Sequence, residues 1–222
     1  VANFVFTKIE PFAQYGFNKS HAAAYALIAY QTAYLKTYYK EDFIAATMST
    51  ELTNTSKLRE FIEELKKLNI EIIKPSINKC YSDFKAINGK LYYGLGAIKN
   101  VGFEAISNIL NERENNGKFK SLFDFINRVN AKDVNKLQLE GLVKAGVFDE
   151  FDMDRNKILN SIPKIIQKIK NINDDKENHQ SNLFDEQDKD KEELDFEPSL
   201  PWSIKNLLSE EFKSIGFYLT NH

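Results

Sequence analysis

The stretch LYYGLGAIKNVGFEAISNIL, residues 91–110, decides the fold that the sequence predicts. Gly94, Gly96 and Gly102 interrupt it, and apolar residues at helical spacing follow directly after the third glycine. Glycine has no Cβ atom, so it permits tight turns and a close approach of the main chain to a neighbour. The stretch therefore predicts a tight turn over residues 99–102 that leads into a helix over about residues 103–114.

The predicted turn consists of Lys99, Asn100, Val101 and Gly102. Asn adopts a left-handed backbone more readily than most residues, and Val101 is suited to anchor the turn in the core. Backbone N–H groups at a helix start are unpaired and attract phosphate, and Lys99 could add a direct charge. The pattern is typical of a helix-hairpin-helix, which grips the DNA backbone without reading its sequence. An ordinary glycine-rich turn is the alternative.

The residues around this stretch predict a mainly α-helical chain with one small β-hairpin. Asn88-Gly89 stands between two apolar runs and predicts a hairpin over residues 84–93, after a short β-rich run at 70–74. Helical spacing also predicts helices over residues 21–39, 42–51, 55–68, 121–129, 135–144 and 154–172, and one that starts at 203 and is followed by a final strand. Thr55 or Ser56 would cap the third of these helices, and Pro163 would break or kink the helix over 154–172. Aromatic residues on these helices are expected in the core: Tyr30, Tyr34, Phe43, Phe61, Phe123 and Phe125.

Charge is unevenly distributed along the 222 residues, although the net charge is only −2. Residues 174–197 carry eleven acidic and three basic side chains, a charge of −8, which leaves +6 for the rest. We interpret the acidic run as a disordered linker and the remainder as a mildly basic folded part.

Several classes of protein are excluded by composition. The single cysteine, Cys80, excludes an internal disulfide and a cysteine-rich zinc site. The three histidines are far apart and lack the spacing of metal ligands. No apolar run of spanning length and no signal peptide is present, so we expect a cytoplasmic protein that does not contact a membrane.

A second candidate site lies in YGFNKSHAAAY, residues 15–25. Asn18 or Ser20 can cap the helix that begins here, and Lys19 and His21 stand at the same positive helix end. Such a group of donors suits a phosphate, and a triphosphate cradle is one function that it could serve. The alternative is an ordinary helix start with exposed basic residues.

Residues 144–149, within LQLEGLVKAGVFD, could form the hairpin of a second, degenerate helix-hairpin-helix. It has only one glycine, so its grip on phosphate would be poorer. The alternative, which we favour as far as DNA contact is concerned, is a helix end at Gly146 after which Val147 and Phe148 return to the core.

The acidic run contains one short apolar stretch, QSNLF, with Gln180, Leu183 and Phe184. Exposed apolar residues in a charged linker suit a peptide that orders only when it enters a partner's groove. Stretches of this kind also arise by chance.

These stretches, taken in order, resemble the C-family replicative DNA polymerases, the bacterial polymerase III alpha subunits. YGFNKSHAAAYALIAYQTAYLKTYY resembles the fingers, LYYGLGAIKNVGFEAISNIL the helix-hairpin-helix region, and LQLEGLVKAGVFD the segment after it. QSNLF is similar to the internal sliding-clamp motif, and EEFKSIGFYLTNH to the approach to an OB domain. The family usually has glycine where Asn100 stands.

The resemblance implies roles for the candidate residues. Asn18, Lys19, Ser20 and His21 would face the incoming deoxynucleoside triphosphate, and Lys99, Asn100, Val101 and Gly102 would hold template–primer DNA. Gln180, Leu183 and Phe184 would bind the sliding clamp, and other replicase subunits are implied partners. The family's magnesium-binding aspartates belong to a palm domain upstream, so no catalytic or metal-binding residue is assigned to this chain, which we expect to be an inactive fragment.

We expect four segments: distal fingers helices at 1–83, the β-hairpin with a tandem helix-hairpin-helix and trailing helix at 84–172, the disordered acidic linker at 173–200, and the start of an OB domain at 201–222. Two other hypotheses remain. One is a non-enzymatic DNA-binding adaptor that combines a helix-hairpin-helix with a clamp-binding peptide. The other is an accessory, translesion paralogue of the same family.

Overall fold

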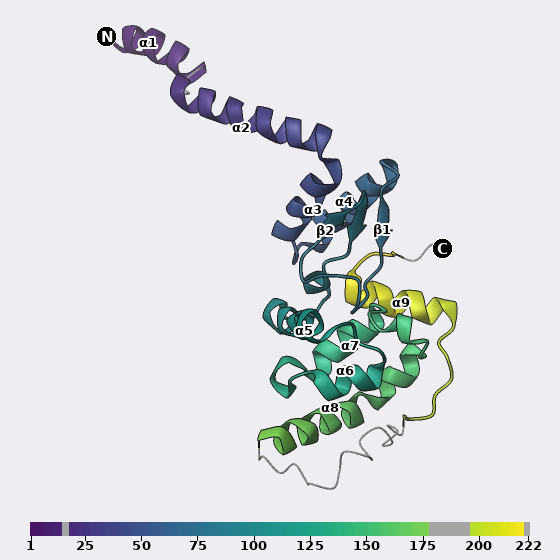
Figure 1. Cartoon of the computed structure of the whole chain (residues 1–222). Helices are drawn as coiled ribbons and strands as arrows, with labels where there is room; N and C mark the ends of the chain where they lie inside the picture. Colours follow the sequence, from purple (N-terminus) through teal and green to yellow (C-terminus); the bar gives the residue numbers. More distant parts are fainter. Residues whose placement is uncertain (15–17, 178–195, 220–222) are drawn as a thin grey trace. The chain divides into compact units, whose positions relative to one another are not determined.

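The computed structural model of this chain describes residues 1–14, 18–177 and 196–219. Helices dominate these residues, with one small sheet, as the sequence predicts (Figure 1). The contacts within the chain divide it into two units, Val1–Phe43 and Ile44–His222. None of the helices in the described ranges is long and apolar enough to span a membrane.

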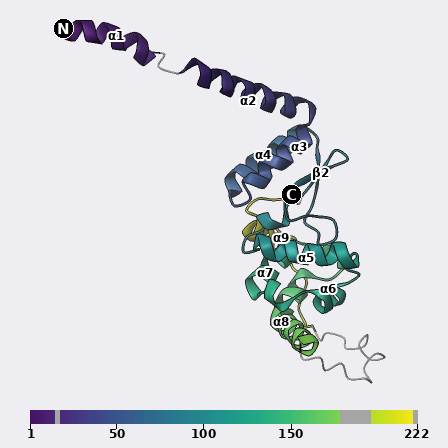
Figure 2. The same ribbon diagram turned by 60° about the vertical axis from the view of Figure 1, so that its left-hand side comes forward.

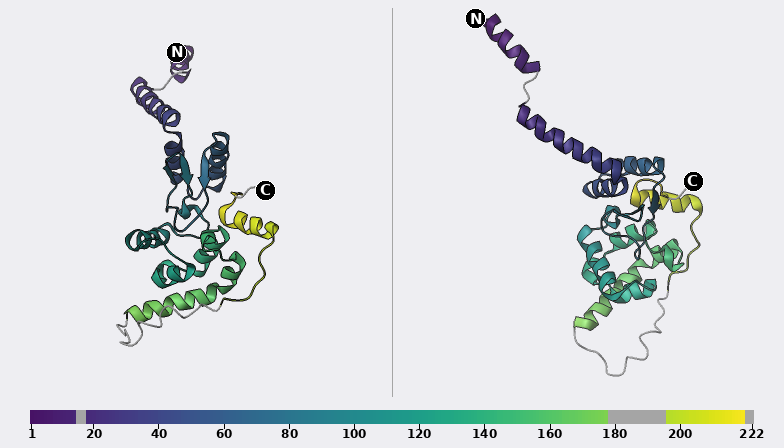
Figure 3. Two further views of the ribbon diagram at one scale, coloured as in Figure 1. Left: turned by 45° about the vertical axis from the view of Figure 1, so that its right-hand side comes forward. Right: turned by 45° about the horizontal axis from the view of Figure 1, so that its top comes forward.

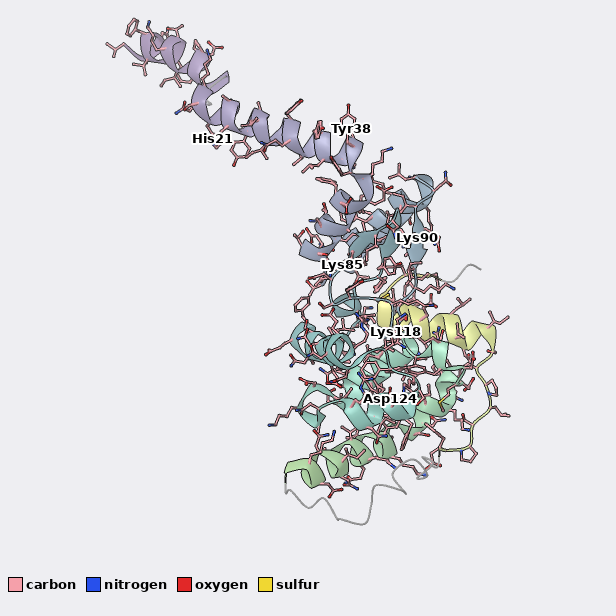
Figure 4. All side chains as sticks on the ribbon, viewed as in Figure 1. His21, Tyr38, Lys85, Lys90, Lys118 and Asp124 are labelled. Carbon is pink, nitrogen blue, oxygen red and sulfur yellow. The ribbon has the colours of Figure 1, made fainter. Side chains whose placement is uncertain are left out.

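The first unit consists mainly of helices α1 (Ala2–Gln14) and α2 (Lys19–Tyr38). Every side chain described in these two helices is exposed, and Figure 4 shows the side chains of α2 projecting away from the helix between His21 and Tyr38. The expectation that Tyr30 and Tyr34 lie in a core is therefore wrong. They are 68% and 45% exposed, because no other described element of the unit covers their face of α2.

The second unit begins with two helices and a three-stranded sheet. Helix α3 (Lys40–Thr50) contributes buried residues from Ile44 onwards, and α4 (Thr55–Lys67) follows. Asn54 caps α4, because its side-chain oxygen accepts a hydrogen bond from the backbone of Lys57 at 3.3 Å. The expected caps, Thr55 and Ser56, lie instead inside the first turn.

The sheet has the strand order β1-β3-β2. Strands β2 (Lys85–Ile87) and β3 (Lys90–Tyr92) form the predicted antiparallel hairpin, and β1 (Glu71–Ile73) pairs with β3 in parallel. Asn88 and Gly89 have φ angles of 51° and 74°, the two left-handed positions that a two-residue type I′ turn requires. Figure 4 shows Lys85 and Lys90 on the two hairpin strands.

The remainder of the second unit is helical. Helix α7 packs against α8 and α9, and α6 packs against α8 (Figure 2). In both views of Figure 3, α9, coloured yellow, lies against the green helices. The elements after the sheet are η1 (Leu95–Ala97), α5 (Phe103–Asn116), α6 (Leu122–Arg128), η2 (Ala131–Asp133), α7 (Lys136–Lys144), η3 (Asp149–Phe151), α8 (Arg155–Glu177) and α9 (Ile204–Ile215).

Helix α8 runs five residues past its predicted end and includes Pro163 in its interior. An interior proline costs a helix about 3 kcal/mol. Four isoleucines on one face of α8 are at most 2% exposed, and their burial offsets that cost: Ile158, Ile162, Ile165 and Ile169.

The chain after α9 does not form the expected strand over the described residues 216–219. Gly216 ends α9 with a left-handed φ of 91°, and Phe217 then enters the core beside Tyr93, with ring centroids 6.5 Å apart. This turn returns the chain to the sheet side of the core.

Candidate nucleic-acid interface

The predicted glycine-bearing turn stands between η1 and α5. Asn100 has a φ of 65°, so it takes the left-handed backbone expected of it. Val101 is 9% exposed and belongs to the core, which confirms its predicted role as an anchor. Its backbone N–H donates to the carbonyl of Ile98 at 3.1 Å and closes the turn. We call residues 98–102 the first turn.

The start of α5 is open. Gly102 is its N-cap, with no side-chain hydrogen bond, and the first hydrogen bond of the helix joins the N–H of Ile106 to the carbonyl of Gly102 at 3.0 Å. In the described part of the chain, the N–H groups of Gly102, Phe103, Glu104 and Ala105 donate to no protein acceptor. These N–H groups, with the positive end of the helix dipole, are the donors that an anion needs.

Two charged side chains flank this opening. The carboxylate of Glu104 is exposed in the first turn of α5. There its negative charge interacts favourably with the positive end of the helix dipole but repels a phosphate. The ammonium of Lys99 reaches the C-terminal end of α9, 3.5 Å from the position that a Cβ atom at residue 216 would take. The main chain of Lys99 contacts the same place, because its N–H donates to the carbonyl of Ser214 at 2.9 Å.

Helix α7 packs directly on the first turn through a glycine. A Cβ atom at Gly141 would lie 2.6 Å from the carbonyl oxygen of Lys99, closer than any real contact of this kind. The side-chain nitrogen of Gln138 lies 3.5 Å from the Cβ position of Gly102. The start of α7 therefore lies beside the start of α5.

A second helix–turn–helix, formed by α6, η2 and α7, packs against the first. The side chain of Asn108 on α5 donates to Asp133 in η2 at 2.8 Å. We call residues 129–135 the second turn. Asn130 accepts from the N–H of Lys132 at 2.9 Å, so a side chain satisfies the main chain here.

The start of α7 is closed by a capping box. The side chain of Asn135 accepts from the N–H of Gln138, and the side chain of Gln138 accepts from the N–H of Asn135, both at 2.9 Å. Two donors that a ligand could use are thus already occupied.

The placement of the second turn corrects the sequence interpretation, which considered residues 144–149 for this role. Those residues run from the last residue of α7 to the start of η3, and between them Gly146 has a φ of 81° and Val147 and Phe148 are at most 2% exposed. The favoured alternative, a helix end that returns to the core, is confirmed. The second turn carries no glycine and begins at Val129, so no glycine signal could have pointed to it.

The other candidate phosphate site is at the start of α2, in the first unit. Asn18 is the N-cap, and its side-chain oxygen accepts from the N–H of Ser20 at 3.1 Å and from its hydroxyl at 2.7 Å. Lys19, Ser20 and His21 are exposed, and the imidazole lies edge-on to Tyr25 with ring centroids 4.4 Å apart. Asn18 and the hydroxyl of Ser20 are thus hydrogen-bonded to each other at the cap, and the side chains of Lys19, Ser20 and His21 are exposed to solvent.

Comparison with known proteins shows which proteins this arrangement resembles. Residues 69–158, which include both turns, match the family described as helix-hairpin-helix motif. The chain is 40% identical over 225 residues to the DNA polymerase III subunit alpha of Borreliella burgdorferi, covering 100% of this chain and 20% of that protein. The same subunit of Thermus aquaticus is 40% identical over 221 residues, with 100% and 18% covered. The chain is homologous to one segment of DNA polymerase III alpha subunits. The resemblance drawn from the sequence is confirmed.

The chain spans about a fifth of the length of these curated relatives. A third relative, the alpha subunit of Campylobacter jejuni, is 40% identical over 220 residues and gives the same proportion, with 96% of this chain and 18% of that protein covered. In the described ranges, no group of three or more His, Cys, Asp or Glu side chains is arranged to hold a metal ion.

Three residues of this chain, Gln180, Leu183 and Phe184, are predicted to bind a sliding clamp. They lie outside the described residues. The chain on their C-terminal side is held by α8. The N–H of Glu197 donates to the hydroxyl of the buried Ser161 at 2.8 Å, and the carboxylate of Glu197 pairs with Lys164 at 2.7 Å.

Proposed function

We propose that this chain is the part of a replicative DNA polymerase that holds template–primer DNA by its backbone. The open start of α5 carries this proposal, since four unpaired N–H groups at a helix N-terminus are suited to a DNA phosphate. The homology to alpha subunits and the helix-hairpin-helix match support it. The whole polymerase would be cytoplasmic and would use magnesium bound outside this segment.

Binding through the DNA backbone predicts how the affinity depends on salt and on DNA sequence. The affinity of the 222-residue chain for a fluorescent duplex should fall linearly with salt on a double-logarithmic plot, because bound phosphates release counterions. Two duplexes of unrelated sequence should bind equally, since phosphate contacts carry no base information. Fluorescence anisotropy across a salt series measures both. A marked preference for one sequence would contradict the proposal.

The start of α2 would contact the triphosphate of the incoming nucleotide in the whole enzyme. Lys19 would supply a point charge and His21 a hydrogen bond, and Asn18 would hold the helix start. The hydroxyl of Ser20 would donate to the triphosphate once it turns away from Asn18. In the full-length polymerase, Lys19→Ala should raise the KM for deoxynucleoside triphosphates. Lys40→Ala, another exposed lysine, is the control. An unchanged KM in Lys19→Ala would reject the nucleotide-binding role of this site.

Tethering to a sliding clamp is proposed for Gln180, Leu183 and Phe184, with other replicase subunits as further partners. A clamp-binding peptide raises the local concentration of the polymerase at DNA without strong contacts of its own. Replacing Leu183 and Phe184 together by alanine should abolish capture of this chain by immobilised clamp and leave duplex affinity unchanged. Retained capture would reject the motif.

A further inference from the structure

We propose that the C-terminal end of α9 holds the first turn in the shape that binds DNA. Ser214, Gly216 and Thr55 are then positioning residues for a site that none of them would touch. The inference rests on the proposed DNA-binding function of the first turn. It assigns to α9, the helix that leads out of the helix-hairpin-helix unit, a role in binding.

The main chain of Lys99 is held from two sides. Its N–H donates to the carbonyl of Ser214 at 2.9 Å, and its own carbonyl oxygen packs on Gly141 of α7. Lys99 immediately precedes Asn100, whose left-handed φ aims the chain into α5. Fixing the peptide groups of Lys99 therefore fixes the starting direction of the segment that carries the open N–H groups.

The end of α9 is buried and held by hydrogen bonds, as such a support requires. Ser214 is 3% exposed, and its hydroxyl donates to the carbonyl of Glu211 at 3.0 Å. The carboxylate of Glu211, itself 2% exposed, accepts from the N–H of Leu219 at 2.8 Å and so closes the turn that follows the helix. Ile215 and Phe217 lie in the core on either side of Gly216.

Gly216 is where three segments of the chain meet. A Cβ atom there would lie 2.2 Å from Cγ2 of Thr55, the first residue of α4, and 3.5 Å from the ammonium of Lys99. Its φ of 91° also requires glycine. A side chain at this position would separate the end of α9 from α4 and displace the carbonyl that Lys99 uses.

Gly117 offers a matched control. It also follows a helix and has a positive φ, 82°, but a Cβ atom there would meet nothing within 4 Å. Gly216→Ala and Gly117→Ala both place alanine at a positive φ, with a ψ of 0° at residue 216 and 173° at residue 117, and only the first introduces a clash. Thr55→Ser removes the clashing methyl group, so the double variant Gly216→Ala/Thr55→Ser tests whether that contact is the cause.

The test measures two quantities on the full chain: duplex affinity by fluorescence anisotropy at low salt, and hydrogen exchange of the Lys99 amide. We expect Gly216→Ala to weaken binding about five- to tenfold and to speed exchange of that amide, whereas Gly117→Ala stays within about twofold of wild type. Adding Thr55→Ser should restore most of both losses.

A folded Gly216→Ala chain with wild-type exchange and affinity would overturn the inference. The buried thiol of Cys80 reports folding, because burial raises its pKa to about 11 and it should resist labelling at neutral pH until the chain opens. Should Gly216→Ala unfold, the milder Glu211→Gln replaces it, with a smaller change expected in the same direction and an absence of change again overturning the inference.

The two readouts also separate this inference from the function on which it rests. A wild-type chain that bound no duplex would refute the proposed function of the first turn. Hydrogen exchange of the Lys99 amide would still decide whether α9 holds the turn, because it needs no DNA.

Discussion

The two turns of the helical unit share a topology and differ at the residue that starts the following helix. In the first turn Gly102 starts α5 with no side-chain cap, so four N–H groups stay unpaired. In the second turn Asn135 and Gln138 satisfy each other's main chain at the start of α7. The cap residue therefore decides whether a helix start is available to a ligand or is already satisfied by its own protein.

The largest expected effect is that of a negative charge placed at each helix start. Gly102→Asp should weaken duplex binding by about tenfold or more, because the carboxylate would occupy the free N–H groups and repel phosphate. Asn135→Asp adds the same charge to a start that is already capped and should cost about threefold or less. Anisotropy titrations at one low salt concentration measure both. Equal losses would erase the distinction between the turns.

Substitutions at the two turns should lower stability by similar amounts but should differ in their effect on DNA affinity. Asn100→Ala should lower the free energy of unfolding by about 1 kcal/mol, because alanine resists the left-handed backbone, whereas Asn100→Gly should not. Asn135→Ala should also cost about 1 kcal/mol, through loss of the cap.

Urea denaturation provides the free energies for these variants, and a duplex titration of each completes the comparison. We expect only the change at Asn100 to weaken DNA binding in the chain that remains folded. A loss of affinity for Asn135→Ala as large as that for Asn100→Ala would show that both turns contact DNA.

Lysine substitutions should give a smaller effect. Lys99→Ala should reduce the salt slope of duplex binding by about one unit if the ammonium contacts phosphate. Lys132→Ala, which changes an exposed residue of the second turn, should leave the slope nearly unchanged. Should Lys99→Ala alter affinity without altering the slope, its ammonium would act through the end of α9 and not through DNA.

The smallest effect concerns the ion pair that joins α7 to α9. Burial raises the pKa of Glu210, but the hydrogen bond from Lys213 and the charge of Lys144, 3.4 Å away, outweigh it and lower that pKa overall. A lowered carboxylate pKa stabilises the fold above the ordinary value of 4.5 and stops doing so as the pH falls through the lower folded value. Glu210→Gln should therefore cost at most about 0.5 kcal/mol at pH 7 and nothing in strong acid, as urea melts at the two pH values would show.

Local signals predicted the parts of the fold that depend on single residues. Asn88-Gly89, Asn100 and Gly146 each adopt the positive φ that their residue types indicate. These predictions succeeded because backbone preference belongs to the residue and not to its neighbours.

Features that depend on distant partners could not be predicted in this way. Lys99 meets Ser214, which is more than a hundred positions along the chain, and no local pattern reports such a contact. The second turn was missed because asparagine side chains replace the expected glycine there. Tyr30 and Tyr34 have the spacing of core residues, yet spacing alone does not supply the element that would cover them.

The glycine inside α7 has a consequence for anyone who tries to make this protein more robust. Replacing helical glycines by alanine is a common route to a higher melting temperature, with a gain of about 1 kcal/mol at a permissive site. Gly141 would be an obvious choice by that logic, but its added methyl group would press on the Lys99 carbonyl from 2.6 Å. At this position a substitution meant to stabilise α7 would push that helix away from the first turn.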